Sequence, residues 1–271
     1  MRKLIASLAI LMGFILLSNE AWAKWEPPQF KLPKIPDGVN LISLGEAFDF
    51  PSGKKVTGYM FIHHKNKSAR NPFSGAAAKS ACYGFLATGA KWKTVEPWII
   101  NPANTRGLSG DFLFQNFTKD IGKWEDAADG KVDNTATFNI LGDGSPTDQI
   151  LSAETKSPDG KNEVYFAKIN QSGVIAVTTI WGYFSGLTSK RQLIEWDQVY
   201  NDTDFDWSAS GEANKMDFED IATHELGHSV GMNDQYNSSC QEVTMYGYAS
   251  NGETKKQTLE AQDILGISTL Y

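Results

Sequence analysis

The residues best suited to chemistry lie in one short run, from His224 to Asp234. His224 and His228 are four residues apart, so on a helix their side chains lie one turn apart on the same face. Two imidazoles in that arrangement can bind one metal ion. Glu225 projects toward the same space without being a ligand, and is placed to take a proton from a water that the metal activates. The run predicts a hydrolytic zinc centre.

The chain must turn back after His228 to deliver a third ligand. Gly231 permits the left-handed backbone that ends a helix. Asp234 follows three residues later, and a carboxylate oxygen is an accepted zinc ligand. A His-Glu-x-x-His string arises by chance in about one chain in a hundred of this length. Two surface histidines on an amphipathic helix are the alternative, but this would leave the glycine and the aspartate unexplained.

The motif requires a helix, and the pattern predicts one over residues 218–230. Asp217 is its expected N-cap, and Asp220 at the third position gives an all-carboxylate form of the capping box. A helix over 111–128 carries apolar residues on one face. A closing helix over 259–270 is capped by Thr258. Six segments are rich in β-branched and aromatic residues and predict strands: 58–64, 92–100, 136–141, 163–169, 174–181 and 193–200. The order predicts a mixed α+β domain.

Three regions divide the chain. Residues 1–23 have a basic start, a short apolar run and a small-x-small end, which predict a cleaved secretory signal peptide and no stable membrane anchor. Residues 24–81 are expected to be a pro-segment or N-terminal extension, irregular over 24–50 and ending in an exposed, cleavable loop at 65–80. Residues 82–271 form the predicted catalytic domain. We therefore expect a secreted, periplasmic or otherwise extracellular protein.

The charge balance limits the partners. The whole chain has 25 basic and 32 acidic residues, and removing Arg2, Lys3 and Glu20 with the signal peptide leaves a net charge of −8. An acidic protein is a poor partner for nucleic acid or for an anionic membrane surface. A protein or peptide substrate is expected instead, and we expect a monomer.

The chain has two cysteines, Cys82 and Cys240. An even number in an exported protein favours one disulfide, which would tie the start of the catalytic domain to the region behind the zinc motif. The alternative is a Cys82 thiolate that caps the metal in a latent form.

The zinc motif and the residues after it resemble the metzincin metalloproteases, whose pattern is His-Glu-x-x-His-x-x-Gly-x-x-His followed by a methionine turn. The segment Thr244-Met245-Tyr246 matches that turn, and residues 258–271 are similar to the closing helix of the matrixin branch. Residues 91–92 and 199–207 also resemble matrixin strand segments. The resemblance covers about residues 82–271. It implies a metzincin-like zincin domain with a twisted mixed sheet, a backing helix, an active-site helix and a C-terminal helix, with Met245 beneath the metal.

One position departs from the metzincin pattern. The third ligand is usually histidine, and here it is Asp234, as in snapalysin-like variants. Glu260 on the closing helix is an alternative third ligand, because the gluzincin class takes a glutamate from a downstream helix. Gly231 and Met245 favour Asp234, since the gluzincin pattern requires neither.

The resemblance implies a secreted zinc endopeptidase in which Glu225 is the general base toward a zinc-activated water. An extended peptide would add to the sheet at residues 174–181, unless this segment is an ordinary core strand. The alternative from another class is a zinc-stabilised extracellular binding or adhesion module without turnover. A structural zinc site favours a fourth protein ligand and would not need Glu225.

Other residues carry weaker hypotheses. His63 and His64 are interpreted as side chains at the end of a strand, with metal binding in a latent form as the alternative. The residues around Cys82 do not match the latency motif of matrixins, in which a cysteine binds the metal of the inactive enzyme. Structural calcium at the acidic stretches 143–148 and 202–206 lacks support, because neither has EF-hand spacing and solvated acidic loops are common.

Overall fold

The computed structural model describes residues 25–36, 38–65 and 81–271. The predicted signal peptide and nearly all of the predicted loop at 65–80 lie outside these ranges. Within them, no helix is long and apolar enough to cross a membrane.

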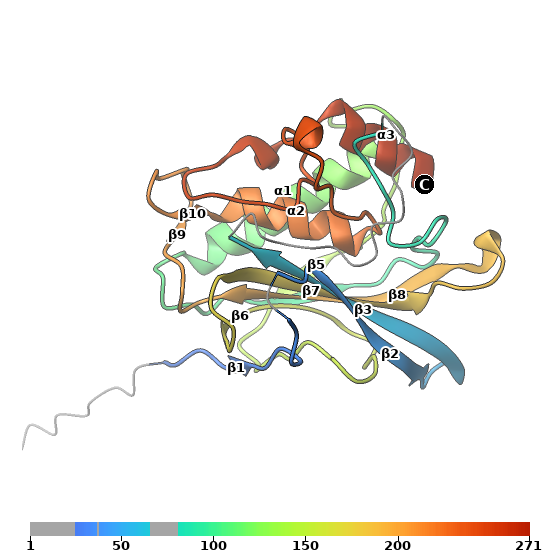
Figure 1. The fold of residues 1–271 in the computed structure, drawn as a ribbon, viewed down its shortest axis with the longest axis horizontal. Coiled ribbons are helices and arrows are strands. Elements are labelled where there is room, and N and C mark those ends of the chain that lie inside the picture. Colours follow the sequence, from blue (N-terminus) through green and yellow to red (C-terminus); the bar gives the residue numbers. More distant parts are fainter. Residues whose placement is uncertain (1–24, 37, 66–80) are drawn as a thin grey trace, which may run out of the picture.

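A large mixed sheet forms the centre of the molecule (Figure 1). Its main strands follow the order β2-β3-β7-β8-β6-β4-β5, and β1 pairs with β6 outside that order. Strands β4, β5, β6 and β8 run parallel, whereas β7, β3 and β2 continue the sheet with antiparallel pairing. The strands are β1 Gln29–Phe30, β2 Leu41–Asp49, β3 Lys54–His64, β4 Trp98–Asn101, β5 Gly144–Pro146, β6 Asn162–Ile169, β7 Val174–Tyr183 and β8 Gln192–Asn201.

Three helices cover one face of this sheet (Figure 1). They are α1 Gly110–Ala127, α2 Phe218–Ser229 and α3 Ala261–Leu270. Ser109 caps α1 by accepting a hydrogen bond from the Phe112 amide at 3.2 Å. Shorter elements complete the chain: β9 Trp207–Ser208, β10 Met216–Asp217, and the 3-10 turns η1 Thr188–Lys190, η2 Ser238–Cys240 and η3 Lys255–Gln257. The predicted α+β class is confirmed.

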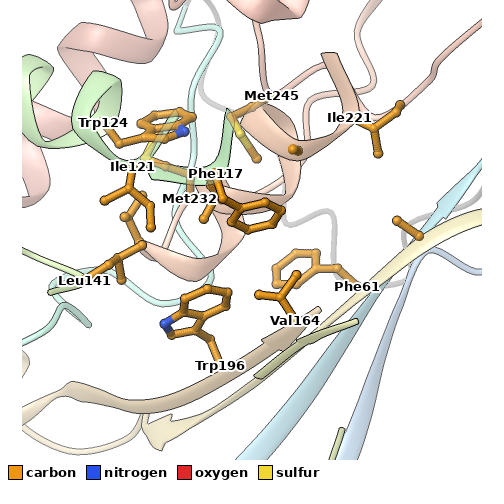
Figure 2. Packing of buried hydrophobic residues seen from close by; sticks show 14 of the residues in the cluster. Phe61, Phe117, Ile121, Trp124, Leu141, Val164, Trp196, Ile221, Met232 and Met245 are labelled. Atoms are coloured by element: carbon orange, nitrogen blue, oxygen red, sulfur yellow. The ribbon is translucent and has the colours of Figure 1, made fainter. Parts of the chain in front are cut away.

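Apolar side chains fill both faces of the sheet. The larger cluster lies between the sheet and the helices and includes Phe61, Phe117, Trp124 and Trp196 (Figure 2). The second cluster lies on the opposite face. Strand β3 contributes to both, because successive side chains of a strand point to opposite faces: Phe61 belongs to the first cluster, Met60 and Ile62 to the second.

The prediction of a strand at 136–141 is wrong, because the structure has no strand there. The amides of Ile140 and Leu141 donate to the Glu125 carboxylate at 2.6 and 3.1 Å. Because a side chain on α1 satisfies these amides, the segment does not need a strand partner. The strand in this region is β5, which starts at Gly144.

Other expected boundaries also shift. The strand predicted over 92–100 is shorter in the structure, where it is β4, Trp98–Asn101. It starts directly after Pro97, which has no amide hydrogen to donate to a neighbouring strand. The closing helix is capped by Glu260 in a reciprocal capping box with Asp263, not by Thr258. Asp217 does cap α2, but the Asp220 carboxylate accepts from the Lys256 amide at 2.8 Å and does not complete a capping box.

Residues 24–50 were expected to be irregular, but part of this region forms strands. Strands β1 and β2 lie within this region, and β2 pairs along its length with β3. Strand β3 in turn pairs with β7. The boundary between an extension at 24–81 and a domain from 82 stays a prediction, but β2 and β3 are part of the same sheet as the later strands.

Candidate metal centre

Helix α2 holds the zinc motif, and the turn after it returns the chain to the motif. Gly231 has φ +102°, a value that L residues with a side chain rarely adopt. A Cβ at this position would also lie 3.0 Å from the Ala90 carbonyl oxygen. The Met232 amide donates to the Gly227 carbonyl at 2.9 Å, which folds the chain back toward α2. This turn brings Asp234 to the two motif histidines.

His224, His228 and Asp234 converge at one point. The Nε2 atoms of His224 and His228 lie 3.2 and 3.4 Å from Asp234 Oδ1. The two imidazole rings are nearly perpendicular, at 88°, with centroids 4.9 Å apart. Their ligand-type atoms all lie within 4.8 Å of one another. The structure therefore brings together the three predicted ligands.

The donor atoms suit a bound cation. His224 Nε2 and Asp234 Oδ1 are buried and have no hydrogen-bond partner among the described residues. Two imidazole nitrogens and one carboxylate oxygen are an established zinc ligand set. Because buried polar atoms without partners are costly, a cation between them would satisfy both. The residues fit zinc.

Backbone carbonyls orient both histidines. His224 Nδ1 donates to the Thr244 carbonyl at 2.7 Å, and His228 Nδ1 donates to the Met232 carbonyl at 3.1 Å. A carbonyl can only accept, so each Nδ1 carries the hydrogen and each Nε2 presents a lone pair to the centre. Tyr236 orients the third ligand, donating its hydroxyl to Asp234 Oδ2 at 2.6 Å.

Met245 packs directly against Gly227 of the motif. A Cβ built on Gly227 would lie 2.2 Å from the Met245 sulfur, so only glycine allows this close approach. Figure 2 shows Met245 among the apolar side chains of the larger cluster, near Trp124 and Phe117. The Asp263 carboxylate accepts from the amides of Thr244 and Met245 at 2.8 and 3.2 Å. Helix α3 therefore fixes the turn that orients His224.

Glu225 is completely buried beside the histidines. Its Oε1 atom is 2.8 Å from His63 Nδ1, and its Oε2 atom accepts a hydrogen bond from the Thr178 hydroxyl. Burial raises the pKa of Glu225 and lowers the pKa of His63. Both carboxylate oxygens are thus held by residues from other elements, Thr178 on β7 and His63 on β3.

Strand β3 covers the centre. The Phe61 ring stacks on the His228 ring with centroids 3.7 Å apart, and the His63 ring lies 4.3 Å from the His224 ring. Phe61 and His63 share one face of the strand, which is why both reach α2. The expectation that residues 174–181 form a free edge for a peptide is wrong in this structure, because β3 pairs along β7.

Some of these contacts had no signal in the sequence. The sequence indicates only a side chain at a strand end for His63, yet His63 contacts the motif glutamate, which is 162 residues away in the sequence. Roles for Thr178, Tyr236 and Asp263 were not predicted. Asp263 had a partial signal, since it lies in the segment that resembles the closing helix of matrixins.

The remaining candidates lie elsewhere. Cys82 and Cys240 form a disulfide with Cα atoms 5.3 Å apart. Glu260, the alternative third ligand, caps α3. His64 Nε2 is 3.1 Å from the Val39 carbonyl oxygen. Among the described residues, the acidic stretches 143–148 and 202–206 form no group of three ligand-type side chains.

A mixed sheet, an active-site helix with two histidines and a glutamate, and a methionine beneath them define a metzincin-type metallopeptidase. The family model described as Matrixin (Peptidase_M10) matches residues 189–271, which span β8, α2, the methionine turn and α3. A search of curated proteins found no match. Residues 189–271 are therefore similar to the matrixin metalloproteases, and the match covers the part of the chain that carries the predicted ligands.

Proposed function

We propose that the chain is a secreted zinc endopeptidase that hydrolyses peptide bonds, with Glu225 as its general base. The observation that carries this proposal is the position of Glu225. It is buried beside the three predicted ligands and next to His224 in the chain, and its ligand-type atom groups with those of His63 and His224 and not with those of His228 and Asp234. When bound, zinc supplies Lewis acidity and makes a coordinated water acidic.

The chain's own residues would supply the proton transfer. Glu225 accepts the proton from the attacking water and passes it to the leaving amine. Thr178 holds Oε2 of the carboxylate.

A zinc-stabilised binding module is the alternative function. It would need a fourth protein ligand to close the metal site permanently. Cys82 is not available for this role, because it is bonded to Cys240. His63 contacts His224 but does not belong to the ligand group of His224, His228 and Asp234.

We also propose that β3, which falls within the predicted pro-segment, keeps the enzyme latent. The strand pairs along β7, and its Phe61 and His63 side chains cover the motif. The histidines and Glu225 are almost inaccessible as a result, at 0–1% exposure. The enzyme would therefore be latent until β3 moves away from β7.

Cleavage of an unfolded protein tests the function. We expect the zinc-loaded chain, after removal of the signal peptide, to cut the substrate, while Glu225→Ala loses cleavage and keeps its zinc. The matched control is Glu219→Ala, which alters a carboxylate on the same helix that pairs with Lys119 and Lys123. It should cut at the wild-type rate. Equal cleavage by wild type and Glu225→Ala would reject the proposal.

If neither form cuts, the same assay is repeated with His63→Ala in both backgrounds. Cleavage that appears only with Glu225 present would identify a latent enzyme. Continued absence of cleavage, with zinc bound in every form, would favour the binding module.

A further inference from the structure

A second group of acidic side chains lies on the sheet face opposite the helices. Glu195 and Asp197 flank Trp196 on β8, and since Trp196 packs toward the helices, the two carboxylates point to the other face. Glu163 at the start of β6 is the register partner of Asp197. Glu154 and Asp159 come from the segment just before β6. We call these five residues the acidic cluster.

The acidic cluster is tightly gathered. Glu154, Asp159 and Glu163 form one group whose ligand-type atoms lie within 4.8 Å of one another. Glu154, Glu195 and Asp197 form a second group with the same spacing. Glu154 belongs to both, so one residue links the two groups.

Three of these carboxylates, Glu163, Glu195 and Asp197, are buried, which distinguishes the cluster from an ordinary acidic loop. Glu195 and Asp197 are 0% exposed and Glu163 is 4% exposed. Within the described part of the chain, Lys161 is the one cation in an ion pair with the cluster, at 2.7 Å from Asp159. Its side chain is 58% exposed, so it compensates little of the buried charge.

Existing hydrogen bonds leave acceptor atoms without partners. The Gly160 amide donates to Glu195 Oε2, and the Glu163 amide donates to Asp197 Oδ1 at 3.1 Å. Glu195 Oε1 and Glu154 Oε2 are buried and have no partner in the described structure. An unpartnered oxygen on a fully buried glutamate is costly unless a proton or a cation meets it.

We propose that the acidic cluster is a divalent-cation site of the calcium type, held by Glu154, Glu163, Glu195 and Asp197 with Asp159 at its rim. All the donors are carboxylate oxygens, which hard cations prefer, and neither an imidazole nor a thiolate is present to select zinc. Calcium sites in proteins also commonly contain several negatively charged carboxylates around one ion. The ion would join the segment before β6 to strand β8, at a place separate from the zinc centre.

The rival explanation is that protons alone neutralise the cluster. Burial raises the pKa of Glu195 to about 8 and that of Glu163 to about 6, and it raises the pKa of Asp197 strongly. A carboxyl whose pKa is raised in the folded state binds more protons than in the unfolded state. Its effect on stability therefore becomes less favourable as pH rises from about 4.5 to 8. Without a cation, the protein should lose stability over this range.

Terbium luminescence tests the proposal on the zinc-loaded full chain, in which the histidine centre is already filled. The Trp181 indole donates to the Glu154 carbonyl at 3.0 Å, and Trp181 is the register partner of Glu195, so a tryptophan lies beside the site to excite the ion. We expect saturable luminescence that calcium displaces. Calcium at a hundredfold excess over its Kd should raise Tm by on the order of 5 °C.

Two substitutions locate the ion. Glu195→Gln keeps the shape and the acceptor for Gly160, and we expect it to weaken calcium and terbium binding at least tenfold; Asp197→Asn should do the same. The matched control is Glu125→Gln, since Glu125 is another carboxylate that accepts backbone amides and whose pKa burial raises. It should bind calcium like the wild type.

The proposal is overturned if calcium shifts neither terbium luminescence nor Tm of the wild type, a result that needs no variant to fold. It is also overturned if Glu195→Gln binds calcium as tightly as the wild type. If Glu195→Gln is more stable than the wild type at pH 8 and calcium has no effect on either, protons neutralise the cluster. None of these results depends on proteolytic activity.

Discussion

The orientation of His224 depends on residues well beyond the zinc motif. Its Nδ1 donates to the Thr244 carbonyl, and the Asp263 carboxylate holds the Thr244 amide in turn. Groups that orient a metal-binding histidine typically change metal affinity 10- to 100-fold when removed. The ligands could be predicted from the sequence because they lie within one run of eleven residues. Asp263 could not be given its role, because only the folded chain brings α3 to the methionine turn.

The third ligand sets the charge of the centre, and this leads to a prediction for Asp234→His. A carboxylate leaves bound zinc with less positive charge than a third imidazole would, so the water on the metal is less acidic. We expect the acid limb of the pH–rate profile to lie at higher pH in the wild type than in Asp234→His. Profiles of kcat/KM for both zinc-loaded proteins measure this, and an unchanged or reversed order would contradict it.

At the scale of elements, α2 and β3 differ in how much the sequence reveals. Helix α2 has its cap at Asp217 and its stop at Gly231, and both signals are local. Strand β3 was partly predicted over 58–64, but its contact with α2 depends on pairing with β7 more than 100 residues later. The prediction of a strand at 136–141 was wrong for a different reason: the Glu125 side chain on α1, only 15 and 16 residues earlier, accepts the amides of Ile140 and Leu141.

If β3 covers the active site, loosening it should increase cleavage. His63→Ala removes a hydrogen bond to a carboxylate, worth about 1.5–3 kcal/mol, and should raise the open population on the order of ten- to a hundredfold. Ile62→Ala weakens packing on the opposite face of the strand and should also raise activity. Lys55→Ala is the control, because its ion pair with Glu46 is exposed.

Initial rates on one peptide substrate compare the three variants with the wild type. A lower rate for His63→Ala, with Ile62→Ala unchanged, would contradict the covering role. It would mean that His63 assists Glu225 in the reaction.

At the scale of the whole molecule, the Cys82–Cys240 disulfide joins residues that are 158 positions apart. It connects the start of the predicted catalytic domain to η2, between the third ligand and the methionine turn. A cross-link over so long a loop restricts the unfolded chain strongly. The region around Asp234 and Met245 is therefore tied to a distant part of the domain by a covalent bond as well as by packing.

Removing this disulfide should lower stability without removing the metal ligands. We expect Cys82→Ser with Cys240→Ser to reduce the free energy of unfolding by about 2–5 kcal/mol. For a domain of this size, Tm should fall by on the order of 5–15 °C. Thermal unfolding of the zinc-loaded proteins measures this. The prediction would be contradicted if the double variant had the same Tm as the wild type. It would also be contradicted if a reductant lowered the Tm of the wild type and of the double variant by the same amount.

Zinc binding by ligand variants tests the central claim most directly. We predict that the wild type and Glu225→Ala each bind one catalytic zinc per chain, that His224→Ala and His228→Ala lose it, and that Asp234→Ala binds it much more weakly. Glu260→Ala is the control, because Glu260 caps α3 and should leave zinc affinity unchanged. Wild-type affinity in Asp234→Ala together with loss of zinc in Glu260→Ala would contradict the centre described for this chain.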